Sequence, residues 1–299
     1  MSSGPSEVSR AERKPAPFIV GAARSGTTLL RLMLDAHRQL AIPSETHFVP
    51  ALLASSEEAG DPSEGFLQKI ISHPLWPDFH LDPSLFRQRV KGLPTFSPGD
   101  GLRVFYALYA ERFGKSRWGD KTPPYVLQMR AIQEALPEAA FVHLIRDGRD
   151  VLASIKGLWF GPASAADAAR WWTERIRAAR EQAVHLHSYL EVRYEELLTA
   201  TETVLRQLCV FLDLPWDEAM LRYYERATLR LAEAAGPIPP PHHTTFGSGT
   251  NRSRIHGLTS TPPARDRIGR WKRELAGSEK NEFEEIARPT LRELGYEVG

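Results

Sequence analysis

Apolar positions along the chain predict strands and helices in alternation. Residues 17–20 form a short apolar run that stops at Gly21, and apolar positions at helical spacing follow from 29 to 34. Residues 139–145 form a continuous apolar run typical of a strand buried on both faces, and 189–193 predicts a further strand. Because helical patterns separate these runs, we expect an α/β fold, a parallel sheet with helices on both faces.

The same apolar pattern, together with local composition, predicts the structure of the other segments. A short strand is expected at 42–43. Helices are expected at 99–113, 125–136, 164–185, 201–213, 216–234, 265–275 and 279–294. The polar residues 1–16 predict a disordered tail, which leaves a single domain at 17–299. Segment 55–100 is rich in proline and aromatic residues, and 236–262 is rich in Pro, Gly, Ser and Thr, so both are expected to be lid or insertion segments.

Composition narrows the class of protein. With 299 residues, 42% of them apolar, the chain can bury a sizeable core. Lys and Arg number 38 against 37 Asp and Glu, which argues against a nucleic-acid binder that works by bulk charge. The single cysteine, Cys209, excludes a disulfide framework and is expected to be a buried thiol. No signal peptide or membrane span is recognised, so we expect a cytoplasmic protein.

The stretch GAARSGTT, which begins at Gly21, has the chemistry of an oxyanion site. Its glycines have the spacing of the G-x-x-x-x-G-K phosphate loop, but Thr27 stands where that loop has its lysine. A strand that stops at a glycine and continues as a helix presents free backbone N–H groups and the positive end of a helix dipole. Thr27 and Thr28 add hydroxyl donors, and Arg24 adds a planar cation. We expect a phosphate group bound without magnesium.

A second motif, RDGRDV, directly follows the predicted strand at 139–145. Asp147 is expected to cap the next helix, with Asp150 three residues on in a variant of the capping box. Arg146 stands at the strand end, where a cation indicates an anion ligand rather than a metal. The adjacent pair His242 and His243 lacks a second cluster, so no metal site is predicted.

With both motifs in this order, the chain resembles the sulfotransferase family, which uses 3′-phosphoadenosine 5′-phosphosulfate (PAPS) and releases adenosine 3′,5′-bisphosphate. The resemblance extends from residue 17 to the C-terminus, and 55–100 is the least matched part. It implies a P-loop-like sulfotransferase fold with a helical lid. By this resemblance the 5′-phosphosulfate is held by Arg24, Ser25, Gly26, Thr27 and Thr28, and the 3′-phosphate by Arg146 and Ser154.

Two further segments resemble the tyrosylprotein sulfotransferases and their bacterial relatives. PSET, with Val-Pro shortly after it, is similar to the segment that carries the catalytic glutamate, and GDKTP to the one that carries a catalytic lysine. The resemblance thus makes Glu45 the general base in an in-line sulfuryl transfer, with Lys121 and Arg24 on the oxygens that gather charge. It also lays Tyr194 against the adenosine. His47 is the rival base, since histidine has that role in cytosolic sulfotransferases.

Departures from the family pattern leave several points open. Thr261 replaces a cofactor-binding lysine before a proline, and Arg252, Arg254 and Arg265 are the candidate replacements. GRWK at 269–272 is only partly similar to a glycine-rich 3′-phosphate loop, and its Trp271 is interpreted as a core anchor.

The alternatives are a nucleotide-dependent kinase, disfavoured by the missing lysine, and a non-catalytic binder of adenosine bisphosphates. The expected partner is a small-molecule or peptide hydroxyl acceptor. A phenol, a peptide tyrosine, a natural product, a lipid and a sugar all stay open, and the oligomeric state is unknown.

Overall fold

A four-stranded parallel sheet forms the centre of the molecule, which we describe from a computed structural model over residues 13–54, 61–158, 161–233 and 260–299. The strand order is β4-β1-β5-β6. Their bounds are Ala16–Gly21 (β1), Asp120–Lys121 (β4), Ala139–Ile145 (β5) and Tyr189–Arg193 (β6). Phe18 lies opposite both Asp120 and Phe141 in the register. The predicted parallel α/β architecture is confirmed.

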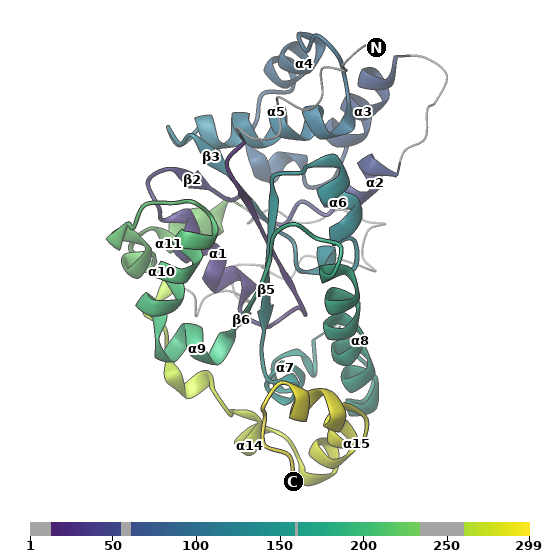
Figure 1. Cartoon of the computed structure of the whole chain (residues 1–299), viewed down its shortest axis with the longest axis vertical. Helices are drawn as coiled ribbons and strands as arrows, with labels where there is room; N and C mark the ends of the chain where they lie inside the picture. The colour runs from purple at the N-terminus through teal and green to yellow at the C-terminus, as the bar shows by residue number, and fades with distance from the viewer. Residues whose placement is uncertain (1–12, 55–60, 159–160, 234–259) are drawn as a thin grey trace.

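Helices cover both faces of this sheet (Figure 1). Ile19, Val142 and Leu144 point to a core shared with helices α1, α9 and α10, whereas Phe18 and Phe141 point to the opposite face. The first face is covered by α1 (Thr27–Asp35), α9 (Tyr194–Thr199), α10 (Thr201–Phe211), η3 (Glu218–Arg222) and α11 (Tyr224–Ala232). The second is covered by η2 (Pro123–Leu127), α6 (Met129–Ala135) and α8 (Ala165–Ala183). Cys209 is buried in the first core, as predicted.

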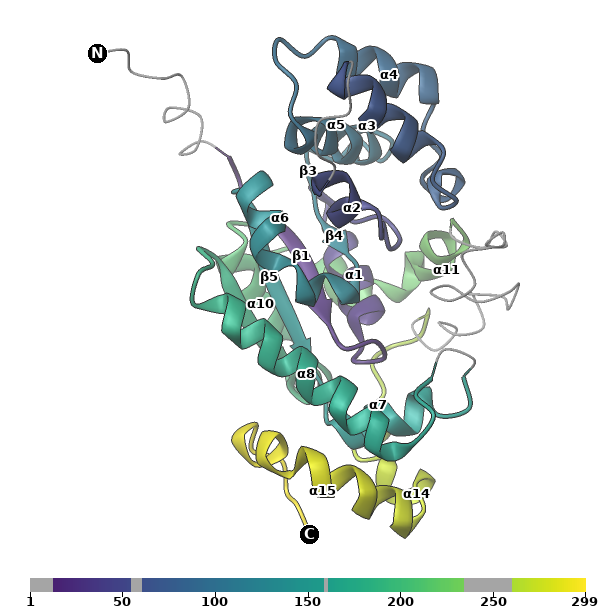
Figure 2. The same ribbon diagram turned by 90° about the vertical axis from the view of Figure 1, so that its right-hand side faces the viewer.

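A group of helices stands at one end of the molecule, opposite α14 and α15 (Figures 1 and 2). It comprises α2 (Val49–Leu53), α3 (Pro62–Ile71), η1 (Trp76–Phe79), α4 (Pro83–Lys91) and α5 (Pro98–Glu111). Asp61, Asp82 and Ser97 cap α3, α4 and α5, each directly before a proline. Whether this group acts as a lid stays a prediction.

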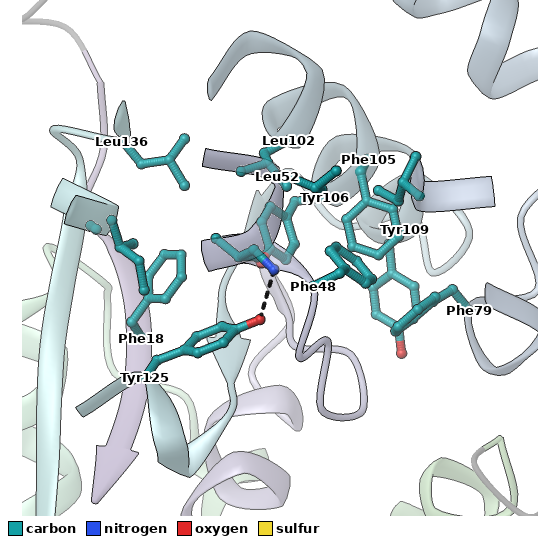
Figure 3. Packing of buried hydrophobic residues seen from close by; sticks show 14 of the residues in the cluster. Phe18, Phe48, Leu52, Phe79, Leu102, Phe105, Tyr106, Tyr109, Tyr125 and Leu136 are labelled. Atoms are coloured by element: carbon teal, nitrogen blue, oxygen red, sulfur yellow. Dashed lines mark hydrogen bonds between the residues drawn. The ribbon is translucent and has the colours of Figure 1, made fainter. Parts of the chain in front are cut away.

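Aromatic rings fill the core of this group (Figure 3). Phe48 packs edge to face on Phe79 and Phe105, with ring centroids 5.8 and 5.3 Å away. Trp76 packs against Phe105 as well. The aromatic residues Trp76 and Phe79 of the segment 73–80 therefore pack the protein's own core.

Three sequence expectations about local structure are wrong. The second strand, β2, is Leu40–Ala41 and pairs with β3 (Arg117–Trp118) beside the main sheet, so it ends one residue before the strand expected at 42–43. The helix expected at 265–275 is two short turns, η5 (Arg265–Arg267) and α14 (Trp271–Glu274), because Gly269 between them has a φ of 69°. Trp271 is only half-buried, so it is not a core anchor.

The C-terminal helix α15 (Gly277–Glu293) packs along α8 and α7 (Gly148–Ile155), with Phe283 against Trp172. Within the described ranges, no helix combines the length and apolar character that crossing a bilayer requires.

Candidate active site

The predicted site residues gather at the carboxyl ends of the four strands. β1 leads into the glycine loop, β4 ends at Lys121, β5 is followed by Arg146, and β6 is followed by Tyr194. In the observed strand order, Lys121 stands on one side of the loop, with Arg146 and Tyr194 on the other. This is the edge at which open α/β sheets bind ligands.

The loop is held in a conformation that glycine and close packing make possible. Arg24 and Gly26 have positive φ values of 69° and 94°. A Cβ on Gly26 would lie 2.4 Å from the Tyr194 ring, so only glycine lets this tyrosine close against the loop. Ser25 is fully buried, and its Oγ has no hydrogen-bond partner among the described residues. A buried hydroxyl of this kind indicates a missing ligand atom or water.

Basic side chains converge beside the loop. Arg24 Nε donates to Ser154 Oγ at 3.2 Å, and Arg146 Nη1 donates to the Arg24 carbonyl at 3.2 Å. Arg146 also lies 4.4 Å from the Tyr194 ring centroid, and its buried Nε has no partner in the described chain. Burial and the neighbouring charges of Arg146 and Arg270 lower the pKa of Arg24. Such an accumulation of positive charge is stabilised by a bound anion.

Glu45 and Lys121 are brought together although 76 residues separate them. Lys121 Nζ lies 2.5 Å from Glu45 Oε1 and 3.4 Å from Thr28 Oγ1, and thus links Glu45 to the first turn of α1, directly after the glycine loop. His47 Nε2 lies 2.8 Å from the other carboxylate oxygen, Oε2. Burial opposes ionisation of Glu45, but the charges of Lys121 and His47 and their hydrogen bonds hold the pKa of Glu45 well below its usual range. Burial lowers the pKa of Lys121.

A buried carboxyl group connects the segments that carry Glu45 and Lys121. Asp120 is fully buried, and its Oδ2 accepts from Thr46 Oγ1 at 2.8 Å and from Tyr106 OH at 2.9 Å. Thr46 Oγ1 also lies 2.8 Å from Tyr125 OH. That hydroxyl accepts a hydrogen bond from the Val49 backbone N–H at 3.0 Å, which is the dashed line in Figure 3. Burial raises the pKa of Asp120 to about 6.

This raised pKa predicts a pH-dependent stability. A carboxyl whose pKa is higher in the folded state than its ordinary 3.8 stabilises the fold most at low pH, and that stabilisation is lost as the pH rises through about 6. Relative to Asp120→Asn, the wild type should lose ~3 kcal/mol of unfolding free energy between pH 4 and pH 8. Urea unfolding of both proteins at each pH measures this. A difference that stays constant with pH would contradict it.

Two further arginines lie at the same site: Arg267, which the sequence reasoning did not single out, and Arg270 of the GRWK segment, which it found only partly similar to a 3′-phosphate loop. Arg146 Nη2 donates to the Arg267 carbonyl at 2.7 Å, and the charge of Arg270 acts on both Arg24 and Tyr194. The candidate Arg265 instead donates to the Thr199 carbonyl, and the candidates at 252 and 254 lie outside the described residues. The dense run of basic residues at 265–273 was the sequence signal that could have indicated these two arginines.

The predicted cap at the start of α7 is half right. Asp147 accepts from the Arg149 backbone N–H at 2.9 Å, as an N-cap does. Asp150 does not complete a capping box, because its carboxylate binds the backbone of the 265–271 segment instead. The predicted absence of a metal site at His242 and His243 falls outside the described residues. Over the described ranges, no group of three or more His, Cys, Asp or Glu side chains is arranged to hold a metal.

Comparison with known proteins identifies what the chain is similar to. A model described as the sulfotransferase family matches residues 15–218. The Drosophila melanogaster protein-tyrosine sulfotransferase is 26% identical over 292 residues, which is 95% of this chain and 52% of the fly protein. An uncharacterized protein of Aquifex aeolicus is 28% identical over 70% of this chain and 26% of its own length. The chain spans about half the length of this fly protein and of the protein-tyrosine sulfotransferase 1 of Danio rerio.

Solved structures show the same fold. The sulfotransferase domain of the curacin biosynthetic pathway has a TM-score of 0.61 at 20% identity, covering 96% of this chain and 99% of that one. The sulfotransferase domain of the Synechococcus PCC 7002 olefin synthase has a TM-score of 0.58 at 22% identity, covering 96% and 98%.

Proposed function

Because the chain belongs to the sulfotransferase family, we propose that it transfers a sulfuryl group from PAPS to an acceptor hydroxyl. The observation that carries this proposal is the position of Lys121 Nζ between Thr28 of the phosphate loop and Glu45. It puts a cation and a carboxylate beside the loop that would hold the transferred group.

The residues present fit the donor. Ser25 Oγ and Arg146 Nε are buried donors without partners among the described residues, and the clustered arginines need an anion. Arg24, the loop N–H groups and the hydroxyls of Thr27 and Thr28 would hold the 5′-phosphosulfate. Arg146 and Ser154 would hold the 3′-phosphate, with Arg270 as the added cation.

In the proposed reaction the acceptor oxygen forms a bond to sulfur while the bond from sulfur to the phosphate oxygen breaks. Glu45 takes the proton of the acceptor hydroxyl, and adenosine 3′,5′-bisphosphate leaves. Glu45 is ionised at neutral pH because its pKa is lowered. As charge gathers on the transferred group, Lys121 is drawn toward it, and the carboxylate loses part of its pairing and becomes more basic.

The acceptor is proposed to be a peptide tyrosine or a small-molecule hydroxyl. The relatives named protein-tyrosine sulfotransferases support a phenolic oxygen. Turnover of labelled PAPS against a panel of phenols, tyrosine peptides, sugars and lipids identifies the class. We also keep a cytoplasmic location as a proposal, on the basis that Cys209 is a buried free thiol; fractionation of tagged cells tests it.

Nucleotide binding separates this function from the kinase alternative. Adenosine 3′,5′-bisphosphate near 100 times its Kd should raise the Tm by on the order of 5 °C without magnesium, because it binds only the folded state. ATP with magnesium should shift the Tm much less. Sulfuryl transfer should also survive EDTA. Stabilisation by magnesium-ATP alone, or activity that EDTA abolishes and magnesium restores, would instead favour a kinase. Binding without transfer to any acceptor would favour a non-catalytic binder.

A further inference from the structure

The segment 265–271 reaches the nucleotide site through backbone contacts with one buried carboxylate. Asp150 Oδ2 accepts from the Gly269 N–H at 2.8 Å, and Oδ1 accepts from the Trp271 N–H at 2.9 Å. Both carboxylate oxygens of Asp150 thus accept hydrogen bonds from backbone N–H groups that are two residues apart. Asp150 itself is fully buried on α7.

The same carboxylate faces the proposed 3′-phosphate site. Arg146 Nη2 lies 3.5 Å from Asp150 Oδ2 and also donates to the Arg267 carbonyl. Asp150 therefore lies between a nucleotide-binding arginine and the segment that carries Arg267 and Arg270. No nucleotide atom need touch it for it to affect binding.

The segment has little regular structure of its own to hold its shape. It contains the three-residue turn η5 and ends where the four-residue turn α14 begins, and Gly269 between them has a left-handed φ of 69°. At its far side the Arg149 guanidinium lies 4.0 Å from the Trp271 ring centroid. The backbone on both sides of Arg270 is thus held by α7, whereas its guanidinium donates to the carboxylate of Glu274 in the next turn at 2.6 to 2.9 Å.

We propose that Asp150 is a positioning residue that latches segment 265–271 onto α7, so that Arg270 stands beside Arg24 and Arg146 to receive the 3′-phosphate end of the nucleotide. This inference rests on the proposed function for its ligand, whereas the latch itself is a property of the unliganded chain. Loss of the latch should free the segment and weaken binding of the 3′-phosphate.

Because Asp150 is negatively charged, the latch and simple electrostatics predict opposite effects of its removal on phosphate binding. Removing a negative charge next to an anion site should, by Coulomb's law alone, strengthen the binding of a phosphate. The latch predicts the opposite, because asparagine offers one acceptor oxygen and keeps at most one of the two backbone hydrogen bonds. Asp150→Asn should weaken adenosine 3′,5′-bisphosphate about 10-fold or more, while adenosine 5′-phosphate changes less than about 3-fold. Calorimetric titration of the full chain measures both.

Two further variants isolate the latch from charge and folding. Gly269→Ala changes no charge but strains the left-handed φ where nothing lies within 4 Å of the new Cβ, so it should cause a weaker loss of the same kind. Asp266→Asn removes a charge from an exposed side chain of the same segment and should bind the bisphosphate like wild type.

Limited trypsin digestion measures how firmly segment 265–271 is held, without any nucleotide present. Cleavage after Arg267 and Arg270, followed by mass spectrometry, should be several times faster in Asp150→Asn than in wild type or Asp266→Asn, because local opening exposes the segment. Unchanged cleavage, or bisphosphate binding as tight as in wild type, would overturn the latch. If the wild type binds no bisphosphate, the proposed function fails, while the digestion still decides whether Asp150 holds the segment.

Discussion

Glu45→Gln should lower kcat by about 10²- to 10⁴-fold while the affinity for the donor nucleotide stays within a few fold. Glutamine keeps the shape of the side chain and one oxygen for Lys121, but it cannot take the proton of an acceptor hydroxyl. The carboxylate lies on the β4 side of the loop, away from Arg146, so its loss should leave nucleotide binding largely intact. Steady-state turnover with the acceptor found by the PAPS screen, together with calorimetry, measures both quantities.

His47→Ala is the matched control for this experiment. His47 touches Glu45 at Oε2, so its removal alters the carboxylate's surroundings without removing the base. We expect a kcat loss of about 10-fold or less, the size of one ordinary lost hydrogen bond, because the carboxylate and its contact with Lys121 stay in place. If Glu45→Gln kept most of its turnover and His47→Ala lost it, with nucleotide binding intact in both, His47 would be the base and the family assignment would stand.

Arg146→Ala should weaken adenosine 3′,5′-bisphosphate by about 2 to 4 kcal/mol, or roughly 30- to 1,000-fold. Arg146 is almost fully buried and has an Nε without a partner in the described chain, so its loss removes a desolvated, charge-assisted contact with the phosphate. Adenosine 5′-phosphate lacks that phosphate and should bind nearly as before. Calorimetric titration with both nucleotides gives the ratio.

Arg146 also has structural contacts, so stability must be monitored alongside binding. Arg103→Ala is a suitable control, because Arg103 is a half-buried arginine on α5, at the end of the molecule opposite α14 and α15 (Figure 1), and its Nε lies 2.5 Å from Glu138. It should lower the Tm without changing the affinity for either nucleotide. Equal losses of both nucleotides in Arg146→Ala would mean that the arginine supports the fold and does not select the 3′-phosphate.

The two largest effects thus fall on opposite sides of the glycine loop. The strand order puts Lys121 next to β1 on one side and Arg146 and Tyr194 on the other. An acceptor-side change should therefore alter turnover, and a nucleotide-side change should alter binding. A fully buried aspartate supports each side. Asp120 precedes Lys121 and bonds to Thr46 next to Glu45, and Asp150 lies beside Arg146.

Local features of the fold could be predicted because their causes are local. The strands at 139–145 and 189–193 have the predicted bounds. For 139–145 the reason is that a continuous apolar run requires burial wherever the chain places it. The glycine loop followed from the backbone freedom of Gly26 and from the change of apolar period after it. Asp147 caps α7 for the same reason, because a cap binds a backbone group two residues away.

Contacts between distant segments were decided only by the tertiary structure. Glu45 and Lys121 meet because β2, shortly before Glu45, pairs in parallel with β3, shortly before Lys121, and no periodicity within either segment encodes that pairing. Asp150 was interpreted as part of a local capping box, yet its partners lie 119 and 121 residues further along the chain. The helix expected at 265–275 fails for the same reason: its amphipathic pattern is a local preference, and a buried carboxylate on α7 takes the N–H groups of Gly269 and Trp271. Long-range hydrogen bonds from a buried charge outweigh a helix propensity of a few tenths of a kcal/mol per residue, which is why this part of the site could be found only in the folded chain.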